Sequence, residues 1–182
     1  MAVDEGERRL QRTLAALNDA GIPYALVGGQ AVAYWVSTID PGAVRTTKDI
    51  DLLLRREDLP RARAAVQAAD MEYFEVMGVG MFLDRADPHP KRAVHLLWSG
   101  EKVRPEYPLP SPRVDERQTL QPGVYVVPLV GLVQMKLMAN RDQDRVHLRD
   151  LIDVGLVHRA MLTGLPRELA SRLETLLTEQ GR

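Results

Sequence analysis

The 182-residue sequence contains no cysteine, few aromatic residues and no apolar stretch as long as a membrane span. The absence of cysteine excludes disulfide bonds and thiolate metal sites, and it fits a reducing compartment. Residues 1–7 do not read as a signal peptide, so we expect a soluble cytoplasmic protein with no membrane contact. A net charge of −1 does not favour the broad nucleic-acid binding that strongly basic domains show.

The sequence does contain enough apolar residues for a core. Hydrophobic residues make up 45% of the chain, and its length favours one domain or one domain with a helical appendage. Short apolar runs bounded by Gly, Pro and polar residues indicate β-strands. The strands that we predict lie at 24–27, 50–54, 71–76, 79–83, 92–98 and 124–127.

Helices are predicted by apolar residues at helical spacing and by end signals such as Gly21 and Pro166. The helices that we predict lie at 4–20, 30–36, 129–140 and 144–161, with two more beginning near residues 57 and 166. The proline-rich stretch 99–123 should be mostly irregular and lie over the surface or a cleft. We therefore predict a mixed β-sheet with flanking helices in residues 1–128, followed by a helical C-terminal part in residues 129–182.

The stretch 27–54 carries the most informative pattern. The strand at 24–27 stops at Gly28 and Gly29, which allow close approach to a ligand, and the helix that follows favours phosphate at its start. Asp49 and Asp51 share one face of the next strand, where two carboxylates repel each other unless a cation binds between them. Such an oxygen pair suits Mg²⁺, which substrate phosphates usually complete. On these residues alone, there is an equal alternative. Gly28 and Gly29 would form only a tight turn, and Asp49 and Asp51 would be solvated acids at an exposed strand start.

The motif residues of this stretch are Gly28-Gly29-x-Ala31 and then Arg45-x-Thr47-x-Asp49-Ile50-Asp51. They resemble the signature of the polymerase-beta-like nucleotidyltransferase superfamily, and within it the small bacterial nucleotidyltransferases of the abortive-infection toxin type. The resemblance implies a nucleotidyltransferase-like α+β fold in which Asp49 and Asp51 are catalytic and hold Mg²⁺. It further implies that Gly28, Gly29, Arg45 and Thr47 contact a nucleoside triphosphate.

A second part of the resemblance lies in the helical stretch that contains Lys136, Arg141 and Asp144. It implies that Lys136 faces the triphosphate across a cleft and that Asp144 or Asp150 orients this lysine or a nearby base. A lysine on an otherwise apolar helix face needs an anionic partner, and a phosphate would serve. The alternative is a lysine that extends to solvent beside solvated acids. The helical periodicity also predicts that Asp150 and Asp153 lie away from the apolar stripe of their helix.

His95 marks a departure from the superfamily pattern. A third carboxylate usually lies on a later strand and helps to activate the attacking hydroxyl, but the matching strand here carries His95 at that position. A neutral imidazole can act as a general base, although a hard Mg²⁺ prefers oxygen ligands. Three readings stay open: His95 is the base, or Asp84, Asp87 or Glu101 substitutes, or transfer is lost and nucleotide binding remains.

Other catalytic motifs are missing from the sequence. No zincin, P-loop, dinucleotide-binding or nucleophile-elbow pattern occurs. His147 and His158 recur on one predicted helix face but lie about 16 Å apart, too far to share a metal ion. We therefore treat both histidines as weak site candidates.

These observations predict a protein that binds a nucleoside triphosphate with Mg²⁺ and transfers a nucleotidyl group to an acceptor hydroxyl. The acceptor could be a protein hydroxyl, an RNA 3′ end or a small molecule. The alternative is a catalytically silent nucleotide-binding or protein-interaction module on the same fold. The resemblance further implies toxin behaviour with an antitoxin partner.

Overall fold

One mixed sheet organises the fold of this chain, whose computed structural model describes residues 2–182 and the side chains from residue 5 onward. The sheet has seven strands in the order β3-β4-β5-β2-β1-β7-β6. The strands are β1 (Tyr24–Val27), β2 (Ile50–Leu54), β3 (Met71–Val76), β4 (Val79–Asp84), β5 (Val94–Trp98), β6 (Gln118–Gln121) and β7 (Val124–Val126).

The central strands β1 and β2 are apolar and almost wholly buried, as strands covered on both faces should be. β1 pairs antiparallel with β2 and parallel with β7, whereas β2 pairs parallel with β5. This register sets Asp51 of β2 opposite Val27 of β1 and opposite His95 of β5. The carboxyl end of β1 therefore meets the amino-terminal ends of β2 and β5.

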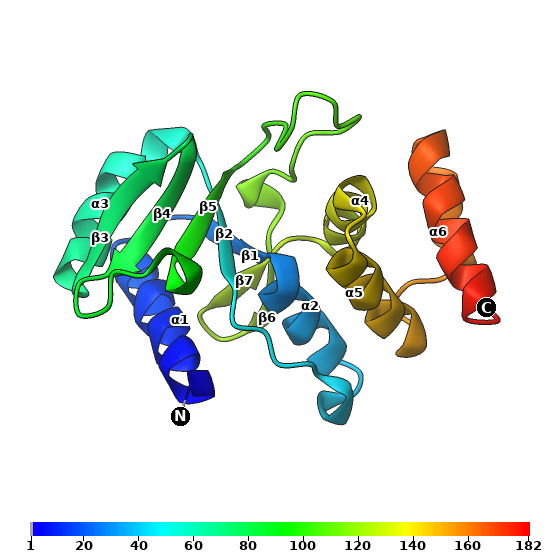
Figure 1. Ribbon diagram of the computed structural model, residues 1–182, viewed down its shortest axis with the longest axis horizontal. Helices are drawn as coiled ribbons and strands as arrows, with labels where there is room; N and C mark the ends of the chain where they lie inside the picture. The colour runs from blue at the N-terminus through cyan, green and yellow to red at the C-terminus, as the bar shows by residue number, and fades with distance from the viewer. Residues whose placement is uncertain (1) are drawn as a thin grey trace.

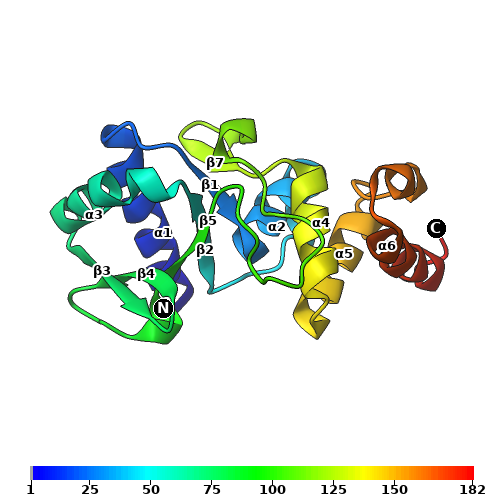
Figure 2. The same ribbon diagram turned by 90° about the horizontal axis from the view of Figure 1, so that it is seen from above.

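Helices cover the sheet and extend beyond one end of it (Figure 1). The helices are α1 (Ala2–Asp19), α2 (Gly28–Ser37), α3 (Leu59–Ala68), α4 (Leu129–Ala139), α5 (Asp142–Asp153) and α6 (Arg167–Glu179). Figure 2 shows α1 and α3 on one side of the central strands and α2 on the other, towards α4 and α5. The helix α6 lies farthest from the sheet, so the C-terminal part extends the molecule sideways.

One hydrophobic core runs through the sheet and the helical part. It contains Leu26 of β1, Leu137 of α4 and Leu151 of α5, each of which is fully buried. Helix α2 packs against β1 and β2 on one side and against α4 and α5 on the other. This core contains residues from both predicted parts, 1–128 and 129–182. The boundary between the two parts stays a prediction.

The fold class predicted from the sequence is confirmed, and so are the six predicted strands. The strand β6 was not predicted, because it lies in the proline-rich stretch and pairs only with β7. The helix predicted at 144–161 is wrong at both ends, since α5 begins at Asp142 and ends at Asp153. Gly155 has a φ of +80°, which a right-handed helix does not contain. Within the described residues, no helix is long and apolar enough to cross a bilayer.

Candidate functional site

Two adjoining clefts lie between the sheet and the helices α4 and α5. Their cavity volumes are about 450 Å³ and about 680 Å³, and we call them the first and the second cleft. The residues that line both clefts form what we call the junction: Gly28, Asp51, His95, Lys136 and Arg141. The junction brings a carboxylate close to two cationic side chains from a distant part of the sequence.

Asp51 is the carboxylate at the junction, and the strand register brings His95 beside it. His95 Nδ1 lies 3.9 Å from Asp51 Oδ1. Burial raises the pKa of Asp51, and the neighbouring Asp49 adds to the rise, although His95, Lys136 and Arg141 oppose it. The ionised form of Asp51 is therefore one that a bound cation would stabilise.

The pair Asp49 and Asp51 fits a hard divalent cation. Asp49 directly precedes β2 and lines the second cleft, close enough for its charge to act on Asp51. In the part of the chain that the structure describes, no group of three or more His, Cys, Asp or Glu residues is placed to hold a metal ion. Mg²⁺ suits a site with two carboxylates because it keeps several waters and is usually completed by substrate phosphates. The donor set thus matches Mg²⁺ bound together with a phosphate ligand.

The glycine pair allows α2 to begin directly against the site. Gly28 has a φ of +65°, and a Cβ on Gly28 would lie 2.2 Å from Asp51 Oδ2. A Cβ on Gly29 would lie 2.8 Å from Thr47 Oγ1 and 3.3 Å from His147 Cε1. Protein side chains therefore fill the space beside both glycines, and no bulkier residue fits there without moving them.

The first turn of α2 can receive an anion. Val27, at the N-cap, makes no side-chain capping hydrogen bond, and both Gly28 and Gly29 line the second cleft. Uncapped N–H groups at a helix start, together with the helix dipole, favour a negative group. Lys48 and Lys91 line the same cleft and add positive charge. This end of α2 therefore has the properties of a phosphate site.

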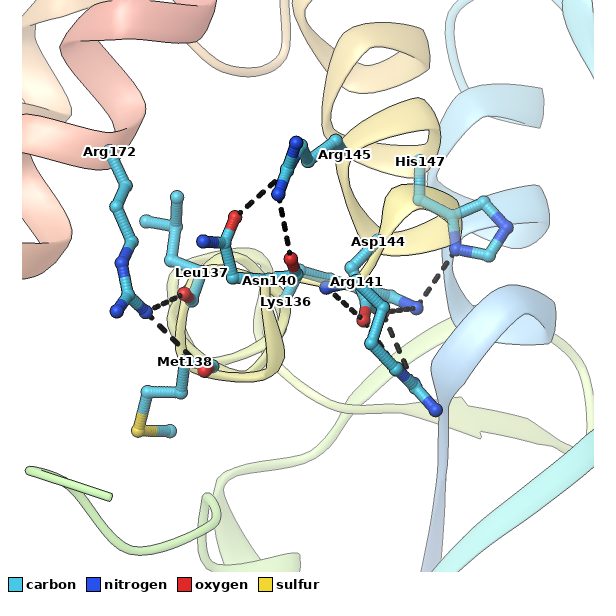
Figure 3. A network of polar contacts seen from close by, with 9 residues as sticks. All are labelled: Lys136, Leu137, Met138, Asn140, Arg141, Asp144, Arg145, His147 and Arg172. Atoms are coloured by element: carbon cyan, nitrogen blue, oxygen red, sulfur yellow. Dashed lines mark hydrogen bonds and ion pairs between the residues drawn. The ribbon is translucent and has the colours of Figure 1, made fainter. Parts of the chain in front are cut away.

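A polar cluster joins α4 to α5 at the junction, and its members Lys136, Asp144 and His147 are buried (Figure 3). Lys136 Nζ lies 2.9 Å from Asp144 Oδ1 and 2.9 Å from His147 Nδ1. Asp144 also accepts hydrogen bonds from Arg141, at 2.7 Å from Nε and at 3.2 Å from the backbone N. Burial alone would raise the pKa of Asp144, but Arg141 and Lys136 outweigh it and hold this pKa below its usual range. The cluster keeps Asp144 ionised and holds Lys136 at the edge of both clefts.

Within residues 2–182, every predicted site residue except Arg45 lies in the lining of one or both clefts. Thr47 and Asp49 line the second cleft, and Asp144 lines the first. Arg45 Nε instead donates to both carboxylate oxygens of Asp150, at 2.8 and 2.9 Å. Asp150, which was predicted to lie away from the apolar stripe of its helix, is buried beneath this ion pair and is not a solvated acid. Asp153 is exposed, as predicted.

The acids proposed as substitutes for a third carboxylate are held in ion pairs. The pairs are Asp84 with Arg12, Asp87 with Arg92 and Glu101 with Arg56. Glu101 does line the first cleft, but its hydrogen bond with Arg56 holds its pKa below the usual range. His95 is therefore the residue that lies beside Asp51 at the position predicted for the third acid, because its strand β5 pairs with β2.

Sequence reasoning missed the place of His147. It set this histidine aside because His147 and His158 are too far apart to share a metal ion, whereas the structure shows the His147 ring in the lining of the second cleft. His147 follows Asp144 by three residues, so both lie on one face of α5. That spacing was a readable signal, but the contact with Lys136 depends on how α4 and α5 pack.

Apolar and aromatic residues contribute to the lining of the first cleft, together with charged ones. Trp98 lines it, with the guanidinium carbon of Arg56 4.4 Å from the ring centroid. Tyr107 lines the same cleft, and Leu132 and Met135 of α4 also contribute to the lining. Walls of this composition suit a flat and partly apolar group such as a base or a sugar.

The sheet, the glycine-led helix and the paired carboxylates together define a nucleotidyltransferase-like fold. The model of a family described as nucleotidyl transferase AbiEii toxin, type IV TA system, matches residues 10–182. The chain therefore belongs to the AbiEii family of nucleotidyltransferase toxins, which confirms the resemblance seen in the sequence. Membership assigns nucleotidyl transfer as the general chemistry and a type IV toxin–antitoxin system as the general setting. No curated protein matches the chain.

Solved structures agree on the fold. An antigenic nucleotidyltransferase-like protein from Paracoccidioides brasiliensis is 21% identical with a TM-score of 0.60, and the match covers 98% of this chain and 89% of that one. The antibiotic-resistance factor ANT(2'')-Ia, in a solution structure, is 14% identical with a TM-score of 0.53, and the match covers 99% of this chain and 86% of that one. Both comparisons show a similar fold.

Proposed function

We propose that this protein binds a nucleoside triphosphate together with Mg²⁺ and transfers its nucleotidyl group to an acceptor hydroxyl. The observation that carries the proposal is the junction, where Asp51, the start of α2 and two cationic side chains meet between two clefts. A triphosphate needs these three elements at once: a metal seat, backbone donors and positive charge. The junction offers them within one continuous space.

Each group at the site has a proposed role. Asp49 and Asp51 hold the divalent ion, which when bound neutralises charge on the phosphates and fixes their geometry. The first turn of α2, at Gly28 and Gly29, receives a phosphate group on its N–H donors. Lys136 supplies positive charge from the opposite wall of the junction.

Other residues orient the substrate. Arg141 lines both clefts and adds a second cation, whereas Thr47 lines the second cleft beside Gly29. Asp144 acts on the substrate through Lys136 and Arg141, because it accepts hydrogen bonds from both. The nucleotide contact predicted for Arg45 gains no support from its ion pair with Asp150.

His95 is the proposed general base. It lies across from Asp51 at 3.9 Å and lines both clefts, so an acceptor hydroxyl at the junction could reach its ring. A neutral imidazole would take the proton of that hydroxyl as its oxygen attacks the α-phosphate and pyrophosphate leaves. The same residue favours the second candidate function, a nucleotide-binding protein without transfer, since imidazole replaces a carboxylate there.

The acceptor hydroxyl, the protein partner and the cellular location are proposed in more general terms. The family description supports pairing with an antitoxin, and the acceptor could be a protein hydroxyl, an RNA 3′ end or a small molecule. The cytoplasmic location expected from the sequence stays a prediction.

The test is titration of the protein by calorimetry with ATP, GTP, CTP and UTP, with and without Mg²⁺. We expect at least one triphosphate to bind in the presence of Mg²⁺ and the Asp51→Asn variant to lose this binding. Binding of none of the four by the wild type would contradict the proposal. Labelled triphosphate with candidate acceptors then separates the two functions, because a silent binder gives bound nucleotide and no labelled product.

A further inference from the structure

The His147 ring of α5 packs against the first turn of α2 and lines the second cleft. Only 8% of the residue is exposed, although its ring contributes to the wall of that cleft. The ring carbon Cε1 lies 3.3 Å from the point where a Cβ on Gly29 would be. Cε1 is bonded to both ring nitrogens, so the edge of the ring that carries Nδ1 and Nε2 lies close to the start of α2.

The contact with Lys136 determines which nitrogen of His147 carries hydrogen. Lys136 Nζ lies 2.9 Å from His147 Nδ1 and 2.9 Å from the carboxylate of Asp144. An ammonium group has only donors, so Nδ1 must accept this hydrogen bond. A neutral imidazole that accepts at Nδ1 carries its hydrogen at Nε2. Burial, followed by the charge of Lys136, lowers the pKa of His147 to about 4, which keeps the ring neutral at pH 7.

In the part of the chain that the structure describes, Nδ1 is the nitrogen of this ring that takes part in a hydrogen bond. The Nε2 hydrogen has no protein acceptor there. Figure 3 shows the second ring nitrogen turned away from Lys136. Nε2 is not among the buried donors that lack a partner in the described residues, so it is open to the cleft, where a ligand oxygen can replace water as its acceptor. The cleft that it lines is the one at the start of α2.

We propose that His147 donates its Nε2 hydrogen to a phosphate oxygen of the triphosphate seated at the first turn of α2. This inference rests on the proposed function and adds to it a neutral donor in the second cleft. Lys136 and Asp144 are then positioning residues for the histidine, because they determine its tautomer and hold its ring. The hydrogen bond gives direction to the phosphate without adding another positive charge.

Two substitutions separate the roles of the two ring nitrogens. His147→Gln places an amide nitrogen near the position of Nε2 and gives up the acceptor for Lys136. His147→Asn places an amide oxygen near the position of Nδ1 and gives up the donor to the cleft. His158→Gln, at an exposed histidine, is the matched control. The probe is inorganic triphosphate with Mg²⁺, because it reports on phosphate contacts without a base.

We expect His147→Gln and His158→Gln to bind inorganic triphosphate within a few-fold of the wild type, and His147→Asn to bind about tenfold or more weakly. Near-normal binding by His147→Asn would overturn the proposal, since the hydrogen bond with Lys136 would then be the only role of the ring. Equal losses in His147→Gln and His147→Asn would overturn it as well. A wild type that binds no triphosphate contradicts the proposed function itself.

The ring nitrogens can also be observed directly. In ¹⁵N-labelled protein at neutral pH, we expect the nitrogen signals of His147 to show a neutral ring with hydrogen on Nε2. Addition of saturating inorganic triphosphate with Mg²⁺ should shift the Nε2 signal more than the Nδ1 signal. An Nε2 signal that does not move while the ligand binds would overturn the proposal, whatever the variants show.

Discussion

The properties of the junction residues depend on neighbours that are distant in sequence. Gly28 and Asp51 form the clearest case, because a Cβ on the glycine would lie 2.2 Å from the Asp51 carboxylate. The glycine therefore has two reasons to be there, its φ of +65° and the space that Asp51 needs. Such a position joins backbone conformation directly to the geometry of the proposed metal site.

Gly28→Ala should lower both stability and nucleotide binding. The positive φ costs an L-residue about 1–2 kcal/mol, and the added methyl group displaces the Asp51 carboxylate. Gly21→Ala is the matched control, since Gly21 has a φ of +61° and open space where its Cβ would be. We expect both variants to lose unfolding free energy in urea, with the larger loss in Gly28→Ala because of the contact with Asp51, and weaker binding of Mg²⁺-triphosphate in Gly28→Ala alone. Equal affinities in the two variants would separate Gly28 from the site.

At the scale of elements, the first turns of α5 both stabilise the start of this helix and line the candidate site. Asp144 stands in its first turn, where a carboxylate favours the helix start, and it accepts the backbone N–H of Arg141. One turn later His147 reaches the second cleft. The same helix turn therefore caps itself, holds Lys136 and lines the site, so its stability should depend on the charge states of these groups.

The stability of the fold should decrease as the pH falls from about 6.5 towards 4, in part because of His147. The pKa of its ring is lowered from 6.5 to about 4, so below pH 6.5 the unfolded chain binds a proton that the folded protein does not. The contribution is fully present above pH 6.5, and up to about 3 kcal/mol is lost on acidification. The charged groups that act on the ring are Lys136, Asp144, Asp150 and Arg141.

The measurement is the free energy of unfolding in urea at several pH values for the wild type and for His147→Gln. The variant should lose less stability than the wild type between pH 7 and pH 4.5. His158→Gln, at an exposed histidine, should follow the wild type. The same pH dependence in all three proteins would show that His147 is not held neutral in the folded state.

Elements and motifs were predictable from the sequence to the extent that they are local. The strands at 24–27 and 50–54 are continuous apolar runs, and the motif between them identified the family. The partner of Arg45 was not predictable, since Asp150 is distant in the chain and reaches it only through the packing of α5. The polar strand β6 was missed for a similar reason, because it is defined by its pairing with β7.

At the scale of the whole molecule, the site exists only where three separated parts of the chain meet. The sheet supplies Asp51 and His95, α2 supplies its first turn, and the helical C-terminal part supplies Lys136. One hydrophobic core runs through all three parts, so their relative positions are fixed by packing. Under the proposed function, the fate of a bound nucleotide depends on His95, the residue that faces Asp51 across the strands.

His95→Asp should make the stability of the whole protein depend on Mg²⁺. A third carboxylate would lie beside Asp51, whose ionised form burial and Asp49 already disfavour, so the variant should be less stable than the wild type without a divalent ion. Bound Mg²⁺ removes this repulsion, and a concentration of 100 times its Kd would add about 2.7 kcal/mol. The measurement is the melting temperature against Mg²⁺ concentration, with His158→Asp as the exposed control.

If His95 occupies the third acid position, the variant should also bind Mg²⁺-triphosphate more tightly than the wild type. Transfer of a labelled nucleotidyl group should then appear or increase, because a carboxylate can both hold the metal and accept the proton of the attacking hydroxyl. A variant that loses the same stability with and without Mg²⁺ would place His95 among the residues that support the fold. The catalytic base would then have to come from another residue of the first cleft, where Glu101 is already paired with Arg56.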